Sequence, residues 1–198
     1  MMFTIRSGSM TAVIDSVGAQ LMSLQSVDGT QYLWQGDPKY WPDRSLTIFP
    51  YVARLTDGCY RYRGELYHMP IHGFAPTAEF SVAEQTDAAI TFVLESCPAF
   101  YEQYPFLFRY SIRYRLENAT LHVEITVENK DEKTMHFGLG GHPGINVPLE
   151  EGLRFEDYVI EVPPCQPRRM EFTPACFITG RELPFPMECN QLPLSHHM

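Results

Sequence analysis

The sequence predicts an all-β fold, an antiparallel β-sandwich, from three observations. Runs that alternate apolar and polar residues fill the middle of the chain, and a period of two is typical of strands with one buried face. The 16 prolines, 13 glycines and 13% aromatic residues favour strands and turns. Helical patterns longer than about three turns are missing, although a typical protein is near one third helix.

The predicted strands begin close to the N-terminus and are separated by recognisable turn residues. Residues 3–25 alternate loosely around a turn at Ser7–Ser9, and Asp28-Gly29 marks the next turn. Residues 35–47 contain two prolines and mixed polarity, so we expect a loop there. We expect Trp41 to pack as the anchor of that loop.

The clearest strands lie between residues 89 and 129. Segments 89–95, 108–117 and 120–129 each place apolar residues on one face and polar residues on the other. A short turn after Glu117 joins the last two as a hairpin. The apolar face of the hairpin consists of Phe108, Tyr110, Ile112, Tyr114, Leu116, Leu121, Val123, Ile125 and Val127. On the polar face, we expect Arg113 or Arg115 to pair with Glu124 or Glu128.

Length and composition indicate one soluble domain over residues 1–198. The net charge of −9, with no cluster of Lys or Arg, argues against a nucleic-acid or anionic-membrane partner. Five cysteines without a CxxC motif indicate reduced thiols, and the N-terminus has no apolar signal segment. We therefore expect a cytoplasmic protein without a membrane span.

Residues 135–148 carry the first candidate for chemistry, His142. Gly140-Gly141 precedes it and Pro143-Gly144 follows, so the sequence predicts a strand over 134–139 that leads into a shaped turn. Histidine exchanges protons near neutral pH. By itself this pattern favours a glycine-rich turn with an incidental histidine.

Two further residues change that interpretation. Arg54 is the one cation in the apolar run 48–55, and an unpaired buried guanidinium is costly, so we expect it to contact a carboxylate, carbonyls or a polar ligand. His72 lies on a turn bracketed by Pro70 and Pro76. One cation and two imidazoles that converge on a concave face would suit a neutral hydroxylated ligand. A metal site formed by His68, His72 and His142 is the weakest alternative, because the expected ligand spacing is missing.

The ordered motifs of the chain resemble the aldose 1-epimerase (galactose mutarotase) family. The similar segments are FPYVARLTDG, MPIHGFA, YPF, YSIRYRLENATLHVEITVENKD and FGLGGHPGINVP. The nearest resemblance is to the bacterial intracellular branch typified by LacX-type proteins, and it covers nearly all 198 residues. It implies a galactose mutarotase-like supersandwich that interconverts the anomers of a free hexose without a metal or organic cofactor.

The resemblance also implies roles for the three candidates. His142 matches the general acid at the ring oxygen, His72 matches a second active-site histidine that hydrogen-bonds the sugar, and Arg54 matches a substrate-binding arginine. The chain departs from the family at Ala53, where asparagine is frequent, and at Pro76, where arginine is usual.

A third departure is length, since the family continues beyond the segment that ends this chain. A substrate-binding Asp and the general-base Glu lie in that later part, and neither Glu182 nor Glu188 matches them. We therefore expect a sandwich that is incomplete at its C-terminus and that self-associates through open sheet edges. Two functions remain open, an aldose 1-epimerase-like enzyme and a non-catalytic carbohydrate-binding module of the same fold.

Overall fold

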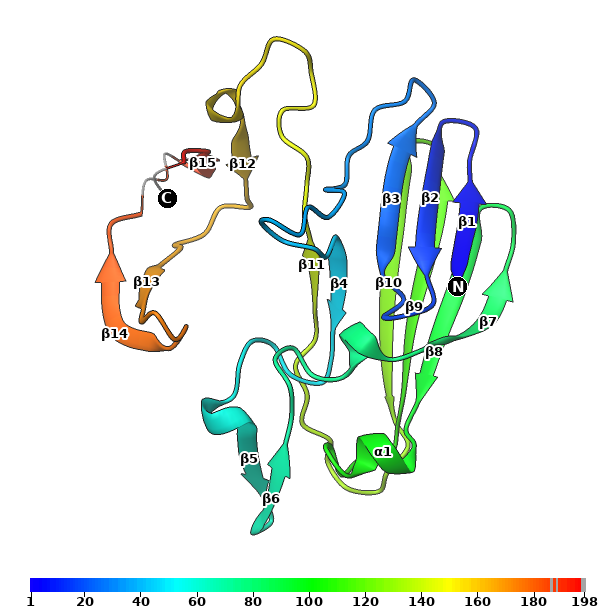
Figure 1. Cartoon of the computed structure of the whole chain (residues 1–198), viewed down its shortest axis with the longest axis vertical. Helices are drawn as coiled ribbons and strands as arrows, with labels where there is room; N and C mark the ends of the chain where they lie inside the picture. The colour runs from blue at the N-terminus through cyan, green and yellow to red at the C-terminus, as the bar shows by residue number, and fades with distance from the viewer. Residues whose placement is uncertain (186, 188, 197–198) are drawn as a thin grey trace. The chain divides into compact units, whose positions relative to one another are not determined.

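The computed structural model describes residues 1–185, 187 and 189–196, and these residues are almost all in strands, turns and loops (Figure 1). Every ladder between named strands is antiparallel, which confirms the predicted all-β class. Contacts divide the chain into two compact units, residues 1–146 and residues 147–198. Glu188, one of the two glutamates considered above, lies outside the described residues.

Two packed sheets form the centre of the first unit. The smaller sheet has the order β1-β2-β3, and the larger has the order β10-β9-β8-β7. Their bounds are Met2–Arg6 (β1), Met10–Asp15 (β2), Leu21–Ser26 (β3), Ser81–Gln85 (β7), Ala89–Glu95 (β8), Phe108–Glu117 (β9) and Thr120–Asn129 (β10). The smaller sheet lies across one face of the larger, with contacts from β1 to β8 and β9 (Figure 1).

Short ladders and single helical turns connect these sheets. Two two-stranded ladders pair β4 with β11 and β5 with β6. Their bounds are Ser45–Ile48 (β4), Gly140–Pro143 (β11), Cys59–Tyr62 (β5) and Glu65–His68 (β6). The helical turns are Thr56–Gly58 (η1), Ala75–Thr77 (η2) and Pro98–Tyr101 (α1).

The second unit also consists of short antiparallel ladders. It pairs β12 with β15 and β13 with β14, and it contains one helical turn, η3. The bounds are Phe155–Asp157 (η3), Val159–Glu161 (β12), Arg169–Phe172 (β13), Ile178–Leu183 (β14) and Gln191–Pro193 (β15).

The burial of β9 follows the period of two that the sequence predicted. Its residues alternate between buried and half-buried up to Leu116, and all five predicted apolar side chains are buried. On the polar face, Arg115 lies 3.9 Å from Glu124 and Arg109 lies 3.7 Å from Glu128. The first of these contacts confirms the predicted cross-strand pairing of charges.

Phe49 is the centre of an aromatic core beneath the short ladders. Its side chain is fully buried and stacks on Tyr110 with ring centroids 4.5 Å apart and an interplanar angle of 12°. The rings of Phe74, Tyr104 and Phe108 meet it edge to face. Such aromatic pairs add about 0.5–1.5 kcal/mol each beyond the area they bury. The segment that follows β4 is therefore held firmly in the core.

The backbone of Phe49 is as constrained as its side chain. Gly73 forms a parallel bridge with it, and the Ala75 N–H donates to the Phe49 carbonyl at 3.2 Å. A Cβ on Gly73 would lie 2.2 Å from that carbonyl oxygen, and Gly73 has φ +75°. Both the close approach and the left-handed angle require glycine at this position.

The structure corrects the prediction for residues 134–144. The segment 134–139 is not in a strand, whereas Gly140–Pro143 forms β11, so His142 lies within a strand and not on a turn. Gly140 and Gly141 do not have positive φ angles. Because they pair with Ile48 and Thr47 of β4, extended backbone is what the ladder requires of them.

We expect Tyr110→Phe and Tyr114→Phe to shift stability in opposite directions. Among the described residues the buried Tyr110 hydroxyl has no hydrogen-bond partner, whereas the Tyr114 hydroxyl donates to the Ala19 carbonyl at 2.8 Å. An unsatisfied buried hydroxyl costs about 1–3 kcal/mol, and a satisfied one contributes about 1 kcal/mol. Urea unfolding should show a gain for the first variant and a loss of about 1 kcal/mol for the second. Equal losses would contradict the assignment.

We expect Gly73→Ala to prevent stable folding, with Gly64→Ala as the matched control. Both glycines have positive φ, but no heavy atom lies within 4 Å of the Cβ that Gly64 would acquire. The control should cost only the left-handed strain, about 1–2 kcal/mol. Gly73→Ala adds the overlap with Phe49, and we expect a total loss above about 4 kcal/mol. Thermal unfolding of both variants measures the difference, and similar losses would refute the packing argument.

Candidate functional site

The structure brings two of the three predicted residues together. The ring centroids of His72 and His142 lie 5.7 Å apart, and the rings meet edge to face at 70°. β11 positions His142, which lies opposite Leu46 of β4. The turn that follows β6 positions His72, next to Gly73. The bridge between Gly73 and Phe49 thus sets the separation of the two imidazoles, since Phe49 directly follows β4.

A reciprocal pair of hydrogen bonds fixes the His72 ring. The backbone N–H of His72 donates to the Ala53 carbonyl at 3.0 Å, and the backbone N–H of Ala53 donates to the ring nitrogen Nδ1 of His72 at 3.2 Å. Because Nδ1 accepts, the neutral ring carries its proton on Nε2. His72 therefore presents an N–H donor on the side of the ring opposite Ala53.

This pair of hydrogen bonds also explains the backbone on either side of it. Ala53 has φ +76° and His72 has φ +65°, both in the left-handed region. Asparagine and glycine adopt that region more readily than alanine. The left-handed backbone at this position explains why asparagine is frequent there in the family that the sequence resembles. With alanine the backbone is strained, and the two hydrogen bonds offset that strain.

Arg54 follows Ala53 and is exposed. The expectation that it is buried is wrong, because β4 ends at Ile48 and residues 51–54 are exposed. Within the described residues its guanidinium has no hydrogen bond or ion pair. A guanidinium that no protein group engages is available to a ligand.

Trp41 belongs to the site, although the sequence indicated only a packing role. Its ring lies 4.9 Å from the His142 ring, centroid to centroid, at an interplanar angle of 39°. The Trp34 Nε1–H donates to the Trp41 carbonyl at 2.9 Å. A Cβ on Gly144 would lie within 2.9 Å of both tryptophans. The predicted packing anchor thus closes over the strand that carries His142.

The electrostatics of the two histidines favour a neutral His72. Burial of its ring, and in second place the nearby charge of His142, lower the pKa of His72 below its usual value of 6.5. Neutral His72 keeps Nδ1 as the acceptor for the Ala53 N–H. The hydrogen bonding and the electrostatics therefore support the same form of the ring.

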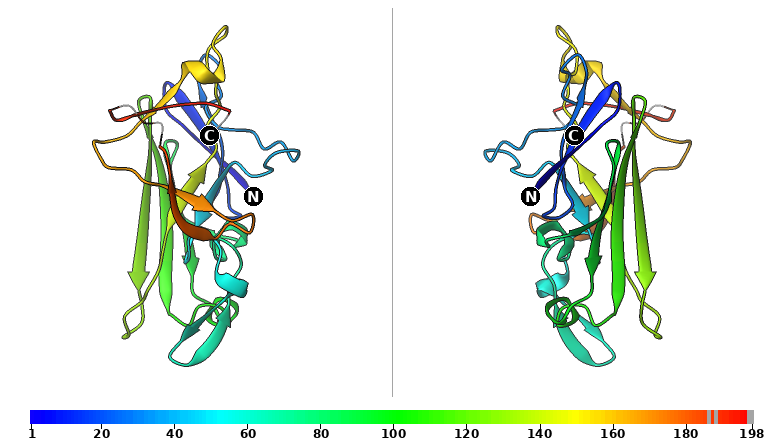
Figure 2. Two further views of the ribbon diagram at one scale, coloured as in Figure 1. Left: turned by 90° about the vertical axis from the view of Figure 1, so that its left-hand side faces the viewer. Right: turned by 90° about the vertical axis from the view of Figure 1, so that its right-hand side faces the viewer.

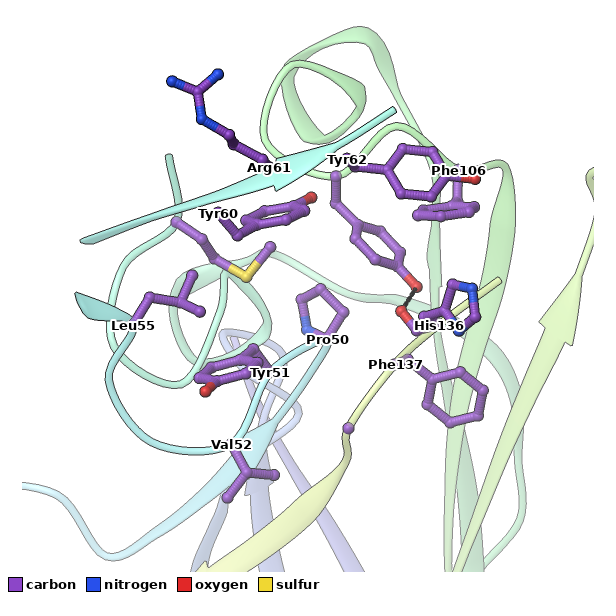
Figure 3. A pocket seen from close by; sticks show the side chains of 13 residues that line it. Pro50, Tyr51, Val52, Leu55, Tyr60, Arg61, Tyr62, Phe106, His136 and Phe137 are labelled. Carbon is purple, nitrogen blue, oxygen red and sulfur yellow. Dashed lines mark hydrogen bonds between the residues drawn. The ribbon is translucent and has the colours of Figure 1, made fainter. Parts of the chain in front are cut away.

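A cavity of about 520 Å³ opens next to the segment that carries Ala53, since Tyr51, Val52 and Leu55 line it (Figure 3). Aromatic side chains line most of it, including those of Tyr60, Tyr62, Phe106 and Phe137 (Figure 3). Two of its hydroxyls are already engaged, since Tyr60 donates to the Gln103 carbonyl and Tyr104 to the His136 carbonyl. None of Arg54, His72 and His142 lines this cavity. This cavity is thus separate from the three candidates, and it is mainly apolar.

The remaining candidates lie apart from the two histidines. His68 ends β6 and pairs with Cys59 in the ladder. In the described part of the chain, no three His, Cys, Asp or Glu side chains gather in a way that could hold a metal ion. All five cysteines are free. Over the same residues, no helix has the length and apolar character to cross a bilayer.

We expect His72→Gln to flatten the pH dependence of stability below pH 7. The folded chain holds the pKa of His72 below that of the unfolded chain, so the unfolded chain binds more protons in that window. The free energy of unfolding should therefore rise with pH up to about 6.5 in the parent chain.

Urea unfolding between pH 5 and pH 7 measures this dependence. His122→Gln is the matched control, because His122 lies on the polar face of β10 and away from this site. The His122→Gln variant should keep the part of the pH dependence of the unfolding free energy that comes from His72. An unchanged pH profile in His72→Gln would contradict the assignment.

Comparisons with known proteins agree with the fold. The aldose 1-epimerase family model matches residues 1–180. The plasmid-encoded LacX protein of Lactococcus lactis is 31% identical over 169 residues, which cover 81% of this chain and 56% of LacX. The chain thus spans little more than half the length of this curated relative.

Two solved structures are similar at 33% identity. One is a galactose mutarotase related enzyme from Lactobacillus acidophilus, with a TM-score of 0.89 over 98% of this chain and 65% of that one. The other is a galactose mutarotase-like protein from Lactobacillus casei, with a TM-score of 0.90 over 100% of this chain and 68% of that one. The predicted galactose mutarotase-like β-sandwich is therefore confirmed. Because the family model matches most of its length, this chain belongs to the aldose 1-epimerase family.

Proposed function

We propose that this chain is an aldose 1-epimerase-like protein that binds a free hexose and interconverts its α and β anomers. The observation that carries the proposal is the pairing of His72 with His142, whose ring centroids are 5.7 Å apart. The family match and the similarity to galactose mutarotase-like structures support the same activity.

The chemistry requires two positioned proton-transfer groups. Mutarotation opens the pyranose ring when the anomeric hydroxyl loses a proton and the ring oxygen gains one, and the ring then closes on the other face of the carbonyl. In our proposal His142 gives the proton to the ring oxygen and recovers it on closure. The C1–O5 bond breaks, with its electron pair going to the protonated ring oxygen, and it re-forms on closure, while the anomeric proton passes to solvent and returns from it. No oxidation state changes, so the reaction needs no metal or organic cofactor.

His72 and Arg54 act as binding groups in this proposal. The Nε2–H that His72 presents donates to a sugar hydroxyl, because Nδ1 is occupied by the Ala53 N–H. Arg54 supplies further donors, since no protein group among the described residues engages its guanidinium. The hydroxyl oxygens of a neutral sugar can accept hydrogen bonds from these N–H donors.

The second candidate function is a non-catalytic carbohydrate-binding module of the same fold. The observation that favours it concerns the general base. In the residues that the structure describes, ion pairs between histidine and carboxylate involve only His122 and His196. His72 and His142 have no carboxylate partner there. The site therefore supplies hydrogen-bond donors and an acid, but no carboxylate paired with either histidine to act as the base.

Three further predictions from the sequence remain part of the proposal. The family match runs across the division at residue 146, which supports one galactose mutarotase-like domain over residues 1–198. The five free thiols fit a cytoplasmic protein. The larger sheet ends on a strand with an open edge, which fits self-association of the chain.

We expect this chain to accelerate anomer exchange and to lose the acceleration in His142→Ala. Removing a general acid should slow exchange by about 10²–10⁴-fold. NMR exchange measurements on α-glucose and α-galactose in a weakly catalytic buffer provide the rate, and saturation-transfer NMR provides binding.

His122→Ala is the control for a histidine on the sheet face, and its rate should match the parent. Arg54→Ala should weaken sugar binding. Binding without acceleration in the parent chain would establish the module and refute the enzyme. Acceleration that survives in His142→Ala would refute the role of His142.

A further inference from the structure

We propose that β10 pairs with β10 of a second copy, antiparallel and about a two-fold axis at Ile125. This inference rests on the self-association proposed above and names the strand, the register and the partner. It joins two four-stranded sheets into one continuous sheet.

The hydrogen-bonding pattern of β9 and β10 shows which groups of β10 are free. A two-residue turn joins the strands, with Thr120 opposite Glu117, and the Lys130 N–H donates to the Leu107 carbonyl at 2.9 Å. Antiparallel strands alternate between bonded and non-bonded pairs. Even-numbered residues of β10 therefore bond to β9, and odd-numbered residues direct their N–H and C=O groups toward the open edge.

The odd-numbered residues are also the apolar ones, and β10 leaves them only partly covered. Val123 is 49% exposed, and Leu121, Ile125 and Val127 are half-buried, whereas the apolar row of β9 is buried. The smaller sheet makes its main contacts with β8 and β9. In Figure 2, β10, in yellow-green, forms the outer edge of the larger sheet. In the proposed pair, the partly exposed apolar side chains of β10 would be covered by the same side chains of the second copy.

The other three edges of these sheets are short or covered, which singles out β10. β1 is half as long as β10, and its Arg6 N–H donates to the Asp87 carbonyl. β7 is half as long as β10, and its pairing with β8 is irregular between Val82 and Glu84. Beside β3, the Leu24 carbonyl accepts from the Tyr32 N–H at 2.9 Å, and Gln25 bridges to Gln31. Short, bulged or covered edges resist pairing. β10 is the long, regular edge among the described strands of the first unit.

Charge selects the register of the pair. With Ile125 opposite Ile125, His122 faces Glu128 and Glu124 faces Thr126, and no like charges are opposed. A register centred on Glu124 would oppose Glu124 to itself, and one centred on Thr126 would oppose Glu124 to Glu128. Opposed like charges destabilise a sheet. A register centred on Val123 avoids this but pairs fewer residues, so the Ile125 register combines full length with compatible charges.

Cysteine cross-linking in solution tests the register directly. In a 198-residue chain whose five native cysteines are replaced by serine, Ile125→Cys should form a disulfide dimer, because bonded antiparallel pairs have Cα atoms about 5.5 Å apart. Val123→Cys alone should not, because it faces Val127 of the second copy. A mixture of Val123→Cys and Val127→Cys chains should form the heterodimer.

Sedimentation velocity of the parent chain at micromolar concentration tests the pairing itself, and we expect a dimer. Val123→Lys should weaken the dimer by about tenfold or more, since lysine on an edge opposes pairing. Thr126→Lys, on the polar face, should retain it, and circular dichroism should show that both variants are folded.

A monomeric parent chain would overturn both the inference and the self-association. A dimer that survives Val123→Lys, or one that cross-links equally at all three positions, would overturn the register while self-association stands.

Discussion

The packing of Phe49 against Gly73 is the constraint on which the site depends. The Phe49 side chain is fixed by stacking on Tyr110 in the aromatic core, and its carbonyl receives the Ala75 N–H. Gly73 can approach that carbonyl because it has no side chain. A segment anchored in the core thereby sets the position of the turn that carries His72. The geometry of the imidazole pair follows from core packing, and this is how a shallow surface site becomes rigid.

Three chain segments that are distant in sequence meet around the two imidazoles. The turn at His72 is tied to Ala53 by two hydrogen bonds, and β11 is tied to β4 by its ladder. Trp41 closes over His142 from the loop before β4. Each imidazole thus has a neighbour that fixes it, a peptide group for His72 and an indole ring for His142. Fixed orientation is what the proposed proton transfer to a sugar would require.

In the sandwich that supports the site, β10 pairs with a neighbouring strand on one side only, and its apolar side chains are partly exposed. β9 lies in the middle of the larger sheet and its apolar row is buried, whereas β10 at the edge has the same apolar pattern but only a partly covered row. A pattern of alternation records which face is apolar, but it does not record how far the opposing sheet extends. The partly exposed row on β10 is therefore a property of the assembly of two sheets of unequal size.

Local patterns determined much of this protein. The alternation in residues 108–129 predicted β9 and β10, the buried face of β9 and the pairing of Arg115 with Glu124, because the pleat of a strand fixes these features locally. The apolar face of β10, predicted to be buried as well, is only partly covered. The ordered motifs likewise identified the family and brought forward His72 and His142.

Tertiary structure decided what depends on distant partners. His142 became part of a strand because β4 supplied the ladder, and Arg54 became exposed because the chain leaves the core after Pro50. Trp41 joined the site because Gly144 leaves room for its ring, a contact between segments that no local pattern records. Side-chain types and periodicity are properties of the chain, whereas burial and neighbours are set only when the sheets pack.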